Sequence, residues 1–460
     1  MERLENRPLE ELAVGDRFVA THAFDIADIE RIAAAASGFD PQIAASGLAS
    51  ANAFLDATSR LSWASLWLAG VVAARFPGVG VLPLSSMVET RAAPTPGQTM
   101  TLALVVRERR EDGRRVTIEA HAADPRGDLA MSATLELVAP LEKTVVRDAD
   151  APPAPHEKGA RGRRLLDMAR RLPALRTAVV HPVDAASLTG AVEAHKLGLI
   201  VAVLVGPEAK IRRAAEAAGI DLLGFEIVAV EHSHAAADAA VALAREGKVE
   251  AIMKGALHTD ELMHAIVRAD SGLRTARRLS HVFAVDAPHY ARPLFITDAA
   301  VNIYPSLIEK RDIVQNAIDL THALGVVAPR VAILSAVETV SPDIRSTIDA
   351  AALCKMADRG QITGARLDGP LAFDNAVSPE AARTKGIVSE VAGRADILVA
   401  PDLEAGNMIA KQLEYLADAE LAGIVLGARV PIMLTSRSDG VRARLGSCAL
   451  ALLMKRATQG

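Results

Sequence analysis

Six short runs of apolar residues, separated by alanine-rich stretches of helical length, constrain the fold of this 460-residue chain more than any other feature. A strand that is apolar throughout, and not only at every second position, is typical of a parallel sheet covered by helices on both faces. We therefore predict an α/β domain with a mainly parallel sheet over residues 165–460. The runs occupy residues 177–180, 200–205, 250–253, 331–334, 397–399 and 424–426.

A proline-rich and then basic segment at residues 142–164 separates this region from a differently patterned one, and such composition indicates a linker. Before the linker we expect a short helix at 26–36 and a long apolar helix at 51–75. Three runs rich in β-forming residues then predict antiparallel strands, with a hairpin turn at Glu111-Asp112-Gly113 between the first two. The N-terminal region, 1–141, is thus predicted to be a separate α+β domain, because 460 residues exceed what one core supports. The β-rich runs are 99–107, 115–122 and 132–138.

Composition excludes several classes of protein. The net charge of −5, without a basic patch carrying aromatic residues, argues against a nucleic-acid partner. No apolar stretch approaches the roughly 20 residues that cross a membrane, and the N-terminus has no signal-peptide pattern. Cys354 and Cys448 fit neither a disulfide framework nor a metal motif. We expect a cytoplasmic protein with no membrane partner and no bound metal.

Polar residues follow the apolar runs of the C-terminal region, where the carboxyl ends of strands in an α/β sheet bind ligands. The chain lacks a phosphate-binding P-loop, a metalloprotease motif and a nucleophile elbow. These residues therefore predict a site that transfers an anion without metal or nucleotide. The candidates for substrate binding are Lys254, His258, Thr297, Asp298, Asn302, Asp368, Asp402 and Asn407.

Ser436 and Arg437 are the strongest catalytic candidates, because they directly follow the apolar run at 430–434. A guanidinium holds phosphate in a bidentate manner, and a hydroxyl donates to an oxygen that gains charge when an acyl carbonyl is attacked. The alternative is a helix cap with a surface ion pair.

Structural alternatives apply to the other candidates as well. Asp368-Gly-Pro is typical of a tight turn, and Asp402 suits a helix N-cap. His258 and His281 fit structural histidines. For Thr297 and Asn302, too, the alternative to ligand binding is a structural role.

Six motifs together resemble the phosphate acetyl/butyryl transferase family across residues 165–453. They are MKGALHTDEL at 253–262, LSHV at 279–282, ITDAAVN at 296–302, DGPLAFD at 368–374, PDLEAGN at 401–407 and LTSR at 434–437. The resemblance implies an isocitrate/isopropylmalate-dehydrogenase-like fold with a cleft between two subdomains. It also implies reversible conversion of a small acyl-CoA and phosphate into acyl phosphate and CoA, with CoA as substrate and no bound cofactor.

The same resemblance implies that Ser436 stabilises the oxyanion and that Arg437 holds the phosphate. The family's aspartate seven residues beyond the serine, proposed to deprotonate the CoA thiol, is replaced here by Ala443. Asp439 is the nearest carboxylate, and we consider it either a substitute base or a helix cap. Lys254, Arg268 and Arg292 are the candidates for contacting CoA.

The N-terminal region resembles the hot-dog domain of MaoC-like (R)-specific enoyl-CoA hydratases in LAVGD at 12–16, in Ser37-Gly38 and in FPG at 76–78. In the hydratase loop an aspartate and a histidine activate water. Here Ile43 stands in place of the histidine, so we predict no hydratase activity and a role in dimerisation or acyl-CoA binding, with a homo-oligomer as the expected assembly. Two alternatives to the transferase are a working N-terminal hydratase and a non-catalytic acyl-CoA-binding or scaffolding protein.

Overall fold

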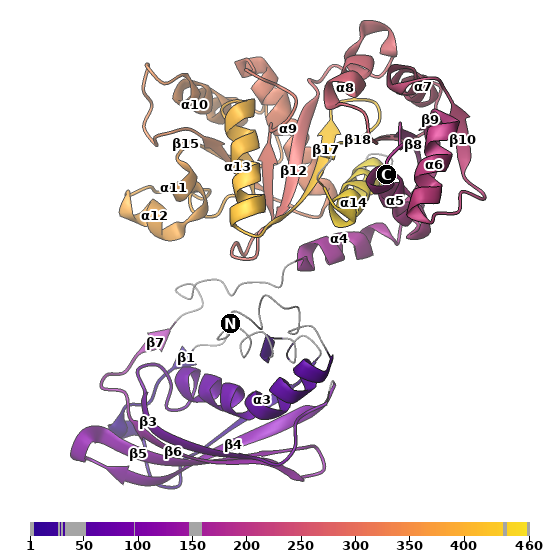
Figure 1. Ribbon diagram of the computed structural model, residues 1–460. Coiled ribbons are helices and arrows are strands. Elements are labelled where there is room, and N and C mark those ends of the chain that lie inside the picture. The colour runs from indigo at the N-terminus through magenta and orange to yellow at the C-terminus, as the bar shows by residue number, and fades with distance from the viewer. Residues whose placement is uncertain are drawn as a thin grey trace. The chain divides into compact units, whose positions relative to one another are not determined.

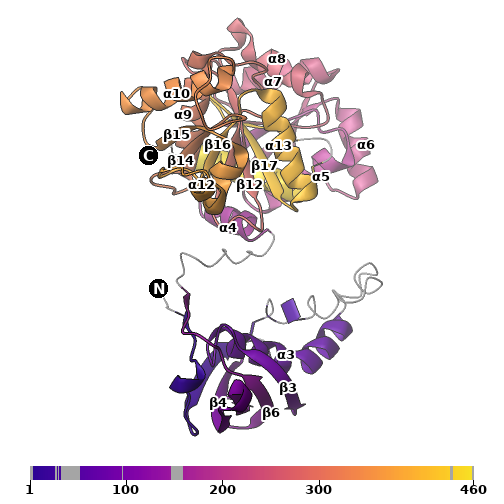
Figure 2. The same ribbon diagram turned by 90° about the vertical axis from the view of Figure 1, so that its left-hand side faces the viewer.

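The computed structural model describes residues 4–25, 28, 31–32, 52–95, 97–146, 159–435 and 439–457. The chain divides into two compact units, Met1–Pro152 and Pro153–Gly460 (Figures 1 and 2). Most of the helix expected at 26–36 and the whole loop at 37–43 lie outside the described residues, as do 147–158 of the predicted linker.

The N-terminal unit is a five-stranded antiparallel sheet with a long helix against it (Figure 1). The strand order is β2 (Arg17–Ala23), β4 (Thr99–Arg110), β5 (Arg115–Ala123), β6 (Leu129–Val138) and β3 (Leu82–Thr90), and the helix is α3 (Asn52–Ala74). Alternate residues of β4 and β5 are buried, which explains why their period-two pattern predicted them correctly. The expected turn is present, with Gly113 at a positive φ of 65°. A short pair, β1 (Leu4–Glu5) with β7 (Val145–Val146), lies outside this sheet.

The C-terminal unit is built on one eleven-stranded sheet with helices on both faces (Figures 1 and 2). In spatial order the strands are β10 (Glu226–Ala229), β9 (Ile200–Gly206), β8 (Leu175–Val180), β11 (Ala251–Lys254), β18 (Ile432–Met433), β17 (Glu420–Leu426), β12 (Ser280–Asp286), β13 (Leu294–Thr297), β16 (Ile397–Val399), β14 (Arg330–Leu334) and β15 (Arg366–Leu371). All six predicted apolar runs are strands of this sheet. The main helices are α4 (Ala160–Ala169), α5 (Ala185–Lys196), α6 (Glu208–Ala218), α7 (Ser233–Arg245), α8 (Thr259–Val267), α9 (Leu307–Ala323), α10 (Arg345–Asp358), α11 (Phe373–Val377), α12 (Pro379–Thr384), α13 (Leu403–Leu416) and α14 (Val441–Ala457).

The centre of this sheet is antiparallel, which the sequence did not predict. Among the described strands seven of the ten pairings are parallel, and the three exceptions join β12 to β13, β12 to β17 and β17 to β18. The mainly parallel sheet is therefore confirmed. Strand β12 was missed because it opens on Ser280 and His281, two polar residues that are nevertheless buried.

The expected tight turn at Asp368-Gly369-Pro370 is wrong, because these residues lie inside β15, the edge strand of the sheet. The pairing with β14 shifts here, so that Asp368 faces Ala332 while Leu371 faces Leu334. The shift gives β15 one extra residue, and a bulge on an edge strand accommodates a proline that has no N–H to donate. The Asp368 carboxylate accepts the Gly369 N–H at 2.8 Å.

Helix α14 is deeply buried in the C-terminal unit. Every residue from Arg444 to Leu453 is inaccessible to solvent or nearly so. It packs on β17, α4 and α5, and Gly446 allows it to approach Ala422 of β17. This packing fixes the start of α14, directly after the segment that carries Ser436 and Arg437. In the parts of the chain that the structure describes, no helix has both the length and the apolar character needed to cross a membrane.

We predict that Gly423→Ala destabilises the C-terminal unit by about 1–3 kcal/mol, because a Cβ at this position of β17 overpacks the core. That atom would lie 2.6 Å from the Leu434 carbonyl oxygen and 2.7 Å from His281 Nε2. Urea unfolding followed by far-UV circular dichroism measures the change.

Tryptophan fluorescence supplies an internal control, since both tryptophans, Trp63 and Trp67, belong to the N-terminal unit and should report an unchanged transition. Gly162→Ala is the matched variant. Its added Cβ in α4 would meet its nearest neighbour at 3.8 Å. An equal unfolding midpoint for Gly423→Ala and wild type would contradict the close packing described here.

Candidate functional site

The chain leaves strand β18 through Thr435, and two buried cations hold this residue. Lys254 Nζ, at the end of β11, donates to the Thr435 carbonyl oxygen at 3.3 Å. Arg444, in the first turn of α14, donates from Nη1 to Thr435 Oγ1 at 2.8 Å. Each of the three side chains is at most 3% exposed. Two positive charges therefore converge, inside the protein, on the residue that precedes Ser436.

Ser436 and Arg437 themselves lie outside the described residues, together with Ser438. The chain is described again from Asp439, which is half-buried. Burial lowers the pKa of Arg444, and the charges of Asp439 and Asp184 partly oppose this shift. Asp184 also caps α5 by accepting the Ser187 N–H at 2.7 Å. The two carboxylates and Arg444 thus form one electrostatic group around Thr435.

Arg444 is a residue that the sequence interpretation missed. Its side chain passes directly over Gly190 of α5, where a Cβ would come within 2.4 Å of Arg444 Cδ. The signal was present in the sequence, because Arg444 is followed by ten uncharged residues in an apolar helix. A charge at the start of such a helix is buried with it and must find partners.

A second group of predicted residues gathers after β13. Thr297 Oγ1 donates to the His281 carbonyl oxygen at 2.8 Å. The Asp298 carboxylate accepts the N–H groups of residues 300, 301 and 302 at 2.9–3.2 Å and the Asn302 side-chain amide at 2.5 Å. Burial raises the pKa of Asp298, and these hydrogen bonds oppose the rise. Asn302 also donates to the Leu279 carbonyl oxygen and accepts from Arg278 Nε, at 2.8 and 2.7 Å.

Helix α13 docks on this group through its first turn. Asp402 caps the helix by accepting the Ala405 N–H at 2.9 Å, as its structural alternative predicted. Asn407 Nδ2 donates to the Ala299 carbonyl oxygen at 3.2 Å. Gly406 is required here, since a Cβ would lie 2.4 Å from the Asp298 carbonyl oxygen.

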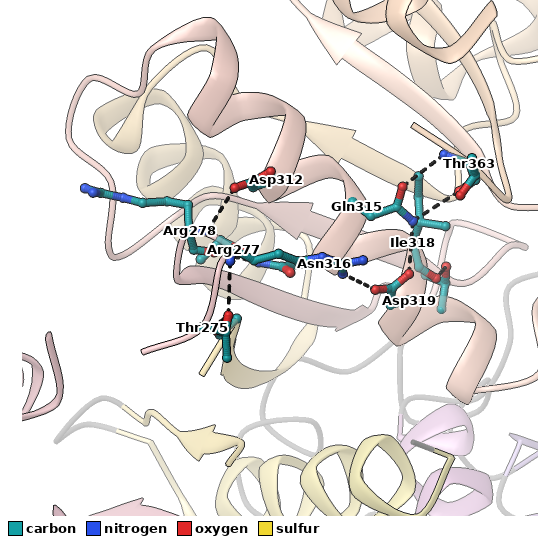
Figure 3. A network of polar contacts seen from close by, with 12 residues as sticks. Thr275, Arg277, Arg278, Asp312, Gln315, Asn316, Ile318, Asp319 and Thr363 are labelled. Atoms are coloured by element: carbon teal, nitrogen blue, oxygen red, sulfur yellow. Dashed lines mark hydrogen bonds and ion pairs between the residues drawn. The ribbon is translucent and has the colours of Figure 1, made fainter. Parts of the chain in front are cut away.

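A polar network fixes the segment that leads into β12 (Figure 3). Figure 3 shows Asp312 and Asp319 of α9 facing Arg278 and Arg277: the Asp312 carboxylate accepts the Arg278 N–H at 3.0 Å, and Asp319 forms an ion pair with Arg277. Asn316 Nδ2 donates to the Arg278 carbonyl oxygen at 2.9 Å. Since Arg278 also bonds Asn302, the network ties α9 to the second group.

The two groups adjoin through His281. Its carbonyl oxygen accepts from Thr297, and its ring lies beside Gly423 together with the carbonyl of Leu434, one residue before Thr435. The imidazole is fully buried, and desolvation lowers its pKa to about 3. His281 is therefore a neutral, structural histidine.

The remaining candidates have the following surroundings. His258 is exposed at the start of α8 and caps nothing with its side chain. Arg268 pairs with Asp238 and Asp270 at 3.0 and 2.8 Å. Arg292 pairs with the buried Asp396. Asp368 lies on the edge strand β15. Over the described ranges, no cluster of three or more potential ligands that could hold a metal is present.

In the N-terminal unit the loop at residues 37–43, which carries Ile43, is outside the described residues. On β2, His22 Nε2 lies 3.0 Å from the Asp28 carboxylate, a pair that the sequence did not predict. The ring of His22 contacts Phe24 edge-on, with the ring centroids 4.7 Å apart. Asp28 also accepts from Arg31 and from the Asp25 N–H.

We predict that His281→Gln flattens the pH dependence of stability between about pH 6.5 and pH 3. In that interval the unfolded chain binds a proton at residue 281 that the folded protein excludes, so the free energy of unfolding falls as the pH falls. The slope should decrease by up to about 1.4 kcal/mol per pH unit in the variant. Urea unfolding at a series of pH values measures it, and the exposed His258→Gln is the control. A wild-type slope in His281→Gln would show that His281 is protonated in the folded protein.

Comparison with known proteins finds relatives of the C-terminal part of this chain. A model of the phosphate acetyl/butaryl transferase family matches residues 233–452. The phosphate acetyltransferase of Rhizobium meliloti is 64% identical over 290 residues, which are 63% of this chain and 92% of that protein. The phosphate butyryltransferase of Clostridium acetobutylicum is 43% identical over 279 residues, 61% of this chain and 93% of that protein.

Among solved structures, a branched-chain phosphotransacylase from Enterococcus faecalis V583 aligns with a TM-score of 0.54 at 28% identity, covering 61% of this chain and 99% of that one. The C-terminal unit therefore has a phosphotransacylase-like fold. By its sequence identity over nearly the full length of such enzymes, the chain belongs to the phosphate acetyl/butyryl transferase family.

Proposed function

We propose that this protein is an acyltransferase that exchanges a small acyl group, of acetyl or butyryl size, between coenzyme A and inorganic phosphate in a reversible reaction. The identity with the phosphate acetyltransferase of R. meliloti is the observation that carries this proposal. The reaction needs no cofactor besides the CoA substrate. The two free cysteines, Cys354 and Cys448, suit the cytoplasm, where we place the reaction.

The chemistry requires positive charge more than a protein nucleophile. A phosphate oxygen attacks the thioester carbonyl carbon, a C–O bond forms, the C–S bond breaks, and the CoA sulfur leaves and takes up a proton. Negative charge on phosphate is joined in the transition state by charge on the carbonyl oxygen. Fixed donors in a site of low dielectric stabilise such charge best.

The end of β18 supplies this environment. Lys254 and Arg444 are buried cations that bond Thr435, so the segment that follows begins in a region of positive potential. We assign phosphate binding to Arg437 and oxyanion stabilisation to Ser436. Asp439, whose charge acts on Arg444, is our candidate for proton exchange with the CoA sulfur.

The second group has an architectural role in this proposal. Thr297, Asp298 and Asn302 direct their hydrogen bonds to other parts of the chain, and Asp402 and Asn407 attach α13 to the same turn. We infer that these residues shape the wall of the substrate site. The buried apolar clusters of the C-terminal unit support a division into two subdomains. One cluster lies around β8, β9 and β11, and another lies around β13, β14 and β16. A third cluster joins them. We place the substrate cleft between these subdomains.

We predict that Ser436→Ala and Arg437→Ala each lower turnover by about a hundredfold or more. This is the usual effect of removing one hydrogen-bond donor to the negative charge of the transition state. Phosphate-dependent release of free thiol from acetyl-, propionyl- and butyryl-CoA by the full-length protein measures this. Arg429→Ala, an exposed arginine, is the matched control and should retain wild-type turnover. Wild-type rates in both site variants would refute the assignment of these residues, and the absence of phosphate-dependent thiol release from wild type would refute the function.

For the N-terminal unit we propose a hot-dog domain whose role is pairing between chains. Strand β3 is an edge of the sheet, bonded to β6 on one side, and Leu82, Leu84 and Met87 are 61%, 49% and 70% exposed. A long edge strand with exposed apolar side chains is a template for another strand. A second copy of this chain offers the same edge, and two copies joined there form one continuous sheet.

We predict that Met87→Lys reduces the mass of the assembly, because a lysine on an edge strand opposes strand pairing. Light scattering after size exclusion measures the mass. Val19→Lys is the matched control, since Val19 is 46% exposed on β2, the opposite edge. An unchanged mass for Met87→Lys, or a loss of mass only in Val19→Lys, would contradict pairing through β3.

A further inference from the structure

A cavity of about 400 Å³ lies within the C-terminal unit, between α4, the start of α14 and the strands β12, β13 and β17. Its volume is in the range of sites for small molecules. The wall is mainly apolar: Leu165 and Met168 come from α4, Phe295 and Ala422 from the sheet, and Gly446 and Leu450 from α14. An apolar chain would therefore replace water in it with favourable contacts.

One polar group in this wall has an unused donor. Arg161, at the start of α4, donates from NH2 to the Tyr290 carbonyl oxygen at 2.6 Å. Its NH1 is buried and meets no hydrogen-bond partner in the described part of the chain. A buried donor without a partner destabilises the folded protein, and more so when it is charged. An acceptor in the cavity would remove this cost.

The surrounding charges favour an anion. Three arginines line the cavity, Arg161, Arg164 and Arg442, against two carboxylates, Asp286 and Glu420. Asp286 accepts the backbone N–H of Arg161 at 3.1 Å, and Glu420 pairs with Arg442 at 3.1 Å. Both carboxylates are thus engaged, while the net charge of the wall is positive.

We propose that this cavity binds a short-chain carboxylic acid, with its carboxylate accepting from Arg161 NH1 and its hydrocarbon chain lying between α4 and α14. The inference does not depend on acyl transfer, since binding requires neither CoA nor phosphate. An acyl phosphate shares this chemistry, an anionic head on a short apolar chain, and the experiment separates the two.

Isothermal titration of the full-length protein with acetate, butyrate, hexanoate and octanoate, at constant ionic strength, tests the proposal. Affinity should rise about fourfold with each added methylene until the cavity is filled. Hexylamine, which carries a positive head, should not bind. Equal affinity for acetate and hexanoate would overturn the proposal.

Arg161→Met should weaken hexanoate binding at least tenfold, and Arg161→Lys should retain part of it, because a cation remains. Arg163→Met is the control, since Arg163 is exposed on the same helix and does not line the cavity. Circular dichroism confirms that each variant is folded. Wild-type affinity in Arg161→Met would refute the site, and Arg161-dependent binding of butyryl phosphate without binding of butyrate would assign the cavity to a phosphate head group instead.

Discussion

The burial of two cations against one residue, Thr435, is the constraint on which the rest of the C-terminal unit depends. An unpaired charge in a protein interior is too costly to persist, so Lys254 and Arg444 need acceptors and counter-charges at fixed places. Thr435 supplies a carbonyl and a hydroxyl oxygen, and Asp184 and Asp439 act on Arg444 as counter-charges. The two cations and their partners lie in or next to four elements, β11, β18, α5 and α14, and thereby tie them into one arrangement. Gly190 is part of it, because only its bare backbone lets the arginine pass.

The antiparallel centre of the sheet explains how the two groups of polar residues become neighbours. In a wholly parallel sheet the carboxyl ends of all strands would lie on the same side of the sheet. Here β17 runs against β18, and β12 runs against β13, so His281 at the start of β12 lies level with Thr297 at the end of β13. The ring of His281 then reaches across Gly423 to Leu434. A neutral imidazole and a glycine thus lie where the two groups of polar residues meet, and neither takes part in the proposed chemistry.

Much of the fold could be predicted from the sequence, because a strand covered on both faces is apolar throughout, as in β8 and β9. Two of the strands that escaped prediction, β12 and β15, contain residues whose accommodation depends on the rest of the fold. Ser280 of β12 accepts from Asn316 of α9, and Pro370 in β15 is accommodated only because its strand is an edge. The site shows the same limit. Position after a strand selected Asp298 and Asn302 as candidates for substrate binding, but it does not reveal that their hydrogen bonds go to other parts of the chain.

Ala443 and Asp439 lie in two different environments, and this bears on the absence of the family's aspartate at position 443. Ala443, on the face of α14 that carries Gly446 and Leu450, lines the apolar cavity, whereas Arg444 turns the other way toward Thr435. A carboxylate at 443 would therefore lie beside hydrocarbon and beside Arg442, which Glu420 already engages. At 439 a carboxylate precedes the helix, where the N-terminal dipole favours negative charge, and it acts on Arg444. In our proposal Asp439 takes the place of the family's acid at 443, which keeps a negative charge next to Arg444 and leaves this part of the cavity wall apolar.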